Sequence, residues 1–143
     1  MTLSDHLAYL DAAYAEALAA PLSRRKAMLA AALADAYADR LATASGADDI
    51  LAFRAGLAAQ SRALGLVFAL CAMGEGAPEL AIDAVEVPIA EYGTLGVEDF
   101  MVSLYNGHRV QRVRVASPQG ERLLALDVLA EAIGVLRGLT PAP

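Results

Sequence analysis

The sequence has little cysteine, few aromatic residues and no long uninterrupted apolar run. Its 143 residues include one cysteine, no tryptophan and 6% aromatic residues. A single cysteine excludes an intrachain disulfide framework and a cysteine metal cluster. Because Cys71 lies within an apolar run, we expect it to be a small buried hydrophobic side chain rather than a reactive thiol.

The sequence also shows no pattern typical of a membrane-spanning helix or of a signal peptide. The longest apolar run, residues 63–73, has eleven residues, whereas a membrane-spanning helix needs about 20. The first ten residues, MTLSDHLAYL, lack the basic stretch that begins a signal peptide. We therefore expect a soluble, cytoplasmic protein that does not contact a membrane.

Residues with catalytic or metal-binding chemistry are few. His6 falls in the first turn of a predicted helix, where we expect a neutral, exposed imidazole. His108 has no cysteine, histidine or carboxylate at the spacing of a metal ligand. No serine lies in a nucleophile elbow, and residues 74–76 lack the spacing of a phosphate-binding loop. The sequence therefore predicts a non-enzymatic protein without a metal or cofactor.

Alanine is what the chain has in excess. It accounts for 33 of the 143 residues, and 24 of these precede residue 74. Alanine has the highest helix propensity but carries little surface to bury. Alanine-rich helices pack closely through thin interfaces, and they often gain stability from another chain. We therefore expect a protein partner or a homo-oligomer.

Three helices are predicted in the first half of the chain, over about 3–20, 23–43 and 49–73, because apolar residues recur there at spacings of three and four. Pro21 and residues 44–46 separate them. The apolar stretch 64–73 is expected to be the most buried element. The expected apolar faces are Leu3, Leu7, Leu10, Tyr14 and Leu18; then Met28, Leu29, Leu33, Tyr37 and Leu41; then Ile50, Phe53, Leu57, Leu64, Phe68 and Cys71.

A β-hairpin is predicted near the C-terminus. Residues 108–116 are rich in valine, residues 117–120 (Ser-Pro-Gln-Gly) favour a turn, and residues 121–126 return. Val110 has the opposite parity to Val113 and Val115, so one apolar face requires a bulge between them.

Other elements flank the hairpin. Pro88 restricts any strand over 82–91 to a sheet edge. Asp127 is expected to cap a last helix over 128–137. Residues 97–105 fit either a helix, with apolar residues at helical spacing and a possible cap at 106–107, or a strand with apolar residues on both faces. The helix explains more of these residues.

These patterns predict a mostly helical α+β protein, in which three alanine-rich helices pack with a C-terminal hairpin and its flanking helices. At this length the chain is expected to be one domain, 1–143, with a helical bundle over 1–74 and a hairpin–helix unit over 80–138.

The net charge of −6 is unevenly distributed along the chain. Residues 1–104 carry six basic and fourteen acidic side chains, a balance of −8, and residues 105–143 carry five and three, a balance of +2. The acidic total disfavours general nucleic-acid binding but does not exclude a local basic surface.

Two basic clusters are the candidate interaction residues. In the hairpin cluster, His108, Arg112 and Arg114 share parity and could form one charged face. This cluster could meet an anionic partner, or it could lie against the acidic residues of its own chain. The second cluster opens a predicted helix, where cations oppose the helix dipole, and it has the same two interpretations. The clusters are His108, Arg109, Arg112, Arg114 and Arg122, and Arg24, Arg25 and Lys26.

If 97–105 is helical, the run SLYNGHRVQRVRVASPQGERLLALDVLAEAIGVL resembles small phage head-completion and head–tail connector proteins of the lambda W type. In that family a helix ends at Gly-x-Arg-Val and is followed by a hairpin turning at glycine and a second helix. The resemblance spans residues 97–137 and implies a role in phage assembly. The matching positions are Gly107, Arg109, Val110, Val113, Gly120 and the helix from Asp127.

If 97–105 is a strand, the region is similar to the start of phage antirepressor N-terminal domains of the BRO type. The matching residues are 105–107 (Tyr-Asn-Gly), 120–121 (Gly-Glu) and 127–128 (Asp-Val). That resemblance implies DNA binding. The sequence thus predicts a protein–protein assembly protein, with a nucleic-acid-binding regulator that uses the basic hairpin 108–122 as the alternative.

Overall fold

A computed structural model describes residues 1–86, 96, 99 and 109–142 of the chain. The described residues form five helices and a three-stranded antiparallel sheet, which confirms the predicted mostly helical α+β class. Within them, no helix combines the length and the apolar character needed to cross a membrane. The elements are α1 (Leu3–Ala19), α2 (Arg24–Ala44), α3 (Ile50–Gln60), α4 (Arg62–Ala72), β1 (Glu79–Glu86), β2 (Arg109–Ala116), β3 (Arg122–Leu124) and α6 (Ala125–Leu139).

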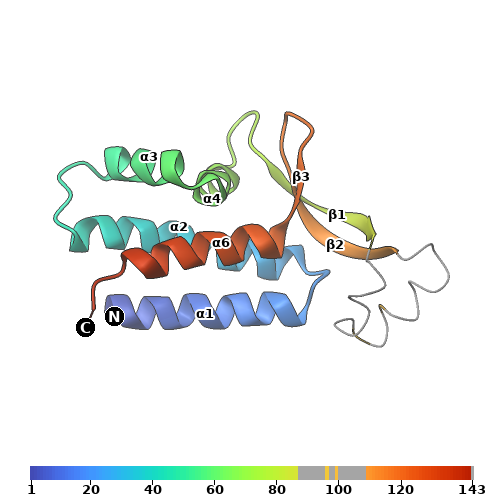
Figure 1. The fold of residues 1–143 in the computed structure, drawn as a ribbon, viewed down its shortest axis with the longest axis horizontal. Helices are drawn as coiled ribbons and strands as arrows, with labels where there is room; N and C mark the ends of the chain where they lie inside the picture. Colours follow the sequence, from blue (N-terminus) through green and yellow to red (C-terminus); the bar gives the residue numbers. More distant parts are fainter. Residues whose placement is uncertain (87–95, 97–98, 100–108, 143) are drawn as a thin grey trace.

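Helix α2 is the centre of the helical body. It packs against α1, α3, α4 and α6, and its first half also meets β1. Figure 1 shows α1, α2 and α6 side by side, with α3 and α4 on the other side of α2. Both chain termini lie at one end of this body, and the sheet extends from the opposite end (Figure 1).

Side-chain caps set the starts of the first helices where the sequence predicts them. The Thr2 hydroxyl accepts a hydrogen bond from the Asp5 backbone N–H at 3.1 Å, and the Asp5 carboxylate accepts one from the Thr2 N–H at 2.8 Å. The Thr2 hydroxyl also donates to the Asp5 carboxylate at 2.9 Å. Because the carboxylate accepts from both the N–H and the hydroxyl of Thr2, the pKa of Asp5 is lowered. Ser23 caps α2 through the Lys26 N–H at 3.1 Å. The bounds of α1 and α2 confirm the first two predicted helices.

The predicted third helix is wrong as a single element, because it divides at Ser61. This residue is extended (φ −132°, ψ 112°), and its buried hydroxyl accepts a hydrogen bond from the Leu64 N–H at 3.2 Å. Ser61 therefore caps a new helix in the middle of an apolar pattern that a single helix also fits. Figure 1 shows the change of direction, with α3 lying across the view and α4 seen nearly end-on.

An arginine attaches α3 to its neighbours. Arg54 forms ion pairs with Asp35 at 2.5 Å and with Asp39 at 2.9 Å, both on α2. Its guanidinium also lies 4.1 Å from the ring centre of Phe68 on α4, in cation–π geometry. This side chain joins three helices from a position that is about four-fifths buried.

The core face of α2 consists mainly of alanine, which corrects the predicted apolar stripe. Leu29 is half exposed, as is Leu18 on α1. Helices on several sides approach α2 closely, and alanine leaves room for their backbones and side chains. The buried residues of α2 are Ala27, Ala30, Ala31, Ala34, Tyr37, Ala38, Leu41 and Ala42.

The stretch 64–73 is not the most buried part of the described chain, contrary to expectation. Three of its ten residues are buried, Leu64, Val67 and Leu70, whereas eight of 21 are buried in α2 and six of 15 in α6. Met73 follows α4 in the left-handed region (φ 51°), and its side chain is 73% exposed. A helix with apolar residues on every side can still have only one of its sides covered by the rest of the protein.

The sheet has the strand order β1-β2-β3, so β1 lies at an edge, as Pro88 predicts for a strand in this region. Strand β1 begins three residues before the predicted position, and residues 87–91 lie outside the described part. Pairing with β2 is continuous from Glu79↔Ala116 to Glu86↔Arg109.

The expected bulge in β2 is therefore wrong. Val113 and Val115 belong to the helical core, and Val110 is buried on the opposite face, where Val85 is its partner across the strands. Because β2 buries side chains on both of its faces, Val110 does not have to share a face with Val113 and Val115, and no bulge is needed.

The hairpin turn is confirmed, and α6 follows β3 directly. Gly120 takes a positive φ of 88°, and the Ser117 N–H donates to the Glu121 carbonyl at 2.9 Å. Helix α6 begins at Ala125 after an N-cap residue, Leu124, that makes no side-chain cap. Asp127 lies in the first turn instead of capping it, which corrects the prediction for this residue.

Candidate interaction surfaces

The basic hairpin residues divide between the two faces of the sheet. The pairings Ala81↔Arg114 and Asp83↔Arg112 place Arg112 and Arg114 on the face away from the helical core. Arg109 has the opposite parity and is exposed. His108, which is predicted to share the face of Arg112, lies outside the described residues together with most of 97–105. The predicted shared face is thus found for Arg112 and Arg114.

On the outer face of the sheet, acids of the same chain form ion pairs with Arg112, Arg114 and Arg122. Arg112 pairs with Asp99 at 2.9 Å, and Asp83 pairs with Arg122 at 2.9 Å and with Arg114 at 3.5 Å. The Arg114 guanidinium also donates to the Arg122 carbonyl at 2.7 Å. The outer face of the sheet is therefore a network of alternating charge.

The arginines of this network also affect the ionisation of Asp83, the acid at its centre. Desolvation opposes ionisation of Asp83, but the positive charge and hydrogen bond of Arg122, the Ala84 N–H and the charge of Arg114 outweigh it. The pKa of Asp83 is lowered as a result. At neutral pH the carboxylate stays ionised, and it pairs with both Arg114 and Arg122.

The second basic cluster lies where α1 turns into α2. Arg24 and Arg25 are exposed, and Lys26 is partly buried. Among the described residues, none of these three side chains forms an ion pair. These are the cations that the structure leaves available at this corner of the molecule.

An open cavity of about 710 Å³ lies beside these cations, between the start of α2 and the connection from α4 to β1. Its apolar lining comes from Met28 of α2, Leu70 of α4 and Pro78 and Leu80 of the following segment. This volume is within the range of about 300–1,000 Å³ that is usual for ligand pockets.

The rim of the cavity has two walls of opposite charge. Arg24 and Arg25 stand on the α2 side, and Glu75 and Glu79 stand on the side of the α4–β1 connection. These four side chains form no ion pair with one another or with other described residues. We name this feature, the open volume with its two arginines, the basic-rimmed cavity.

Sequence reasoning found the arginines but missed the cavity. Residues 73–80 provide most of the second wall, and in the sequence they read only as a helix end. Met73 and Gly76 adopt left-handed backbone conformations in this wall (φ 51° and 72°). A run of small and turn residues does not by itself predict such a geometry.

His6 is buried, which corrects the expectation of an exposed imidazole. Only 4% of it is accessible, its Nε2 lies 3.0 Å from the Leu33 carbonyl, and its ring meets Tyr37 edge-on at 5.1 Å. His6 packs between α1 and α2, and this packing role is enough to explain why a histidine occurs at this position.

Cys71 is half-buried, and its thiol is weakly acidic. Desolvation raises its pKa from 9.0 to about 11, and the negative charge of Asp35 adds to the rise. The environment therefore suppresses thiolate formation. Within residues 1–86, 96, 99 and 109–142, no three histidine, cysteine or acidic side chains are grouped as metal ligands.

Comparison of the chain with models of protein families, with curated proteins and with solved structures gives no match. The functional interpretation therefore depends on the two surfaces described above.

Proposed function

We propose that this chain is a non-enzymatic assembly protein that works by protein–protein association, with the basic-rimmed cavity as its docking site. The observation that carries the proposal is the combination of an apolar lining with two arginines that form no ion pair with the described residues, on an acidic protein. Protein segments that are both acidic and apolar match such a surface.

The hairpin gives less support to the nucleic-acid alternative. Asp83 and Asp99 hold Arg112, Arg114 and Arg122 in ion pairs, and phosphate would have to displace these acids. Nucleic-acid binding gains most of its affinity by neutralising phosphate with uncompensated cations. Protein association is thus the better-supported function.

A more specific proposal is assembly in a phage or prophage. It rests on the resemblance of residues 97–137 to connector proteins of the lambda W type. Genes for capsid or portal proteins next to the gene for this chain would support it. Neighbouring genes of unrelated metabolism would count against it.

Light scattering over a concentration series, combined with a mobility assay on duplex DNA at low salt, tests the function. Assembly predicts a molar mass above that of the 14.9 kDa monomer and no DNA retention. Retention that falls steeply with salt and is lost in an Arg112→Ala/Arg114→Ala variant would instead establish the DNA-binding alternative. A monomer at every concentration would contradict self-assembly.

A further inference from the structure

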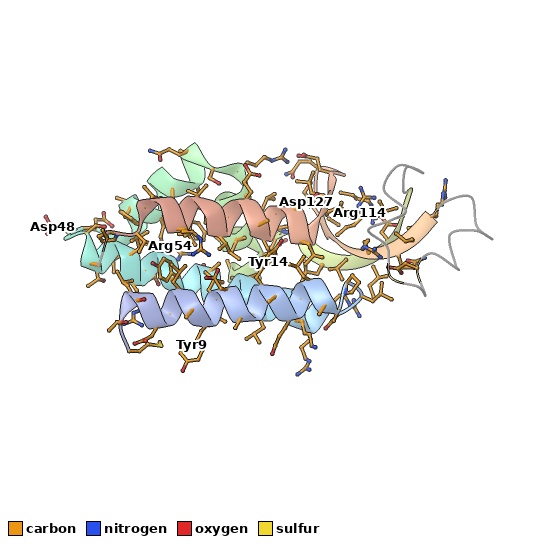
Figure 2. All side chains as sticks on the ribbon, turned by 60° about the horizontal axis from the view of Figure 1, so that its bottom comes forward. Tyr9, Tyr14, Asp48, Arg54, Arg114 and Asp127 are labelled. Atoms are coloured by element: carbon orange, nitrogen blue, oxygen red, sulfur yellow. The ribbon has the colours of Figure 1, made fainter. Side chains whose placement is uncertain are left out.

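The connection between α2 and α3 presents acidic and apolar side chains together. Asp48, Asp49, Ile50 and Leu51 are all exposed, and Leu51 is 79% accessible. Figure 2 shows Asp48 at the extreme end of the molecule, with its side chain directed away from the body. We name residues 48–51 the acidic tip.

Local structure fixes the shape of the acidic tip. Gly46 adopts a positive φ of 74° where α2 ends, and the Asp49 carboxylate accepts a hydrogen bond from the Ala52 N–H at 3.1 Å, capping α3. Arg54, one turn further on, ties α3 to α2 through Asp35 and Asp39. The tip is therefore held in place by both helices, while Asp48 makes no ion pair or hydrogen bond with the described residues.

The acidic tip and the basic-rimmed cavity lie at opposite ends of α2. The cavity uses Arg24, Arg25 and Met28 at its start, whereas the tip follows its last residue, Ala44. A helix of 21 residues is about 30 Å long at a rise of roughly 1.5 Å per residue. The tip cannot reach the cavity of its own chain, so any contact between them joins two copies.

We propose that the acidic tip of one copy docks into the basic-rimmed cavity of a second copy. Leu51 would contact the apolar floor, and Asp48 would lie beside the two arginines of the α2 wall. Glu75 and Glu79, on the other wall, would repel the acids of the tip and so set its orientation. Asp48 is thus complementary in charge to the arginine wall, and Leu51 is complementary to the apolar lining of the cavity.

This contact joins two different surfaces, so it is heterologous. Such contacts produce rings when the rotation closes and filaments when it does not. The inference rests on the proposed assembly function and deepens it by naming the occupant of the cavity.

Two variants test the contact from its two sides. Leu51→Asp removes the apolar side chain of the tip, and Arg24→Glu/Arg25→Glu reverses the charge of the cavity wall. Each alone should weaken self-association by about tenfold or more, because the first removes an apolar contact and the second replaces attraction of the acidic tip by repulsion. Sedimentation velocity measures the dissociation constant.

A mixture of the two variants gives the sharpest result. The Arg24→Glu/Arg25→Glu chain keeps an intact tip, and the Leu51→Asp chain keeps an intact cavity, so one contact can form between them. We expect a 1:1 complex in the mixture that neither variant forms alone. A matched control, Tyr9→Asp, changes an exposed residue of α1 (62% accessible) and should associate as the wild type does.

Circular dichroism checks that each variant is folded. All the substituted side chains are exposed, so we expect every variant to fold. Wild-type multimers that persist unchanged in both variants would overturn the tip–cavity contact while leaving the assembly function in place. A monomeric wild type that retains DNA would overturn both. Failure of the mixture to form a 1:1 complex, when each variant alone is monomeric, would also overturn the contact.

Discussion

At the residue scale, the surroundings of a side chain decide its chemistry more than its type does. His6 and Cys71 are the side chains whose types most suggest catalysis. One packs between a carbonyl and Tyr37, and the other is held as a thiol by desolvation. Arg114 shows the same effect, because its guanidinium already forms an ion pair with Asp83 of the same chain.

Cys71 should react slowly with alkylating reagents. A pKa of about 11 instead of 9.0 leaves about a hundredfold less thiolate at any pH below the lower value. The alkylation rate with iodoacetamide near pH 8 should therefore be about a hundredfold lower than that of the urea-unfolded chain. It should rise about tenfold per pH unit until the pH approaches about 11. Equal rates in the folded and unfolded chain would contradict the raised pKa.

Ser61→Ala should destabilise the protein by about 1 kcal/mol, because it removes the cap of α4. The Leu64 N–H that the hydroxyl satisfies lies in a buried region, where an unpaired donor cannot turn to water. Urea unfolding followed by circular dichroism measures the loss. Ser4→Ala, at an exposed position of α1, provides the control and should change stability by less than about 0.5 kcal/mol.

At the scale of elements, α2 explains why so much of the chain is alanine. It is surrounded by four other helices and a strand, and small side chains on its buried face let these elements approach. The exposed face of the same helix also carries alanine, at Ala32 and Ala36. Composition alone does not separate the two faces.

Ala34→Leu and Ala32→Leu should separate those faces by experiment. Ala34 has no accessible surface, so the added atoms overpack the core and should cost about 1–3 kcal/mol. Ala32 is exposed, and leucine has nearly the same helix propensity as alanine, so the second change should cost less than about 0.5 kcal/mol. Thermal unfolding compares them. Equal stability of the two variants would contradict the position of α2.

At the scale of the whole molecule, a hydrogen bond joins α2 to the residue that follows α6. The Tyr37 hydroxyl lies 2.6 Å from Thr140 Oγ1, and Thr140 donates to the Leu136 carbonyl at 2.8 Å. Since the threonine proton is already used, Tyr37 is the donor. Tyr14 makes a weaker link from α1, with its hydroxyl 3.4 Å from the Leu126 carbonyl and near Asp127, as Figure 2 shows.

Tyr37→Phe should therefore lower the free energy of unfolding by about 1 kcal/mol, the usual net value of one hydrogen bond. The ring stays in the core, so the loss reports the link between α2 and Thr140 rather than packing. Tyr9→Phe is the matched control, because Tyr9 points away from the body (Figure 2). A change of equal size in both variants would show that the buried hydroxyl contributes nothing particular.

The sequence alone determined the class of the fold and most element positions. Alanine content and apolar spacing predict α1 and α2, and the Ser-Pro-Gln-Gly run predicts the hairpin turn. These features depend on residues close together in the chain. Local propensity and capping are therefore enough to specify them.

Only the tertiary structure decided the break at Ser61, the burial of His6 and the state of the candidate surfaces. A serine within an apolar pattern fits both the interior of a helix and its cap, and packing selects the cap. Asp83 and Arg114 are 31 residues apart, and the acidic tip and the cavity lie at opposite ends of α2. Charges and cavities of this kind depend on residues distant in the chain, which local spacing does not encode.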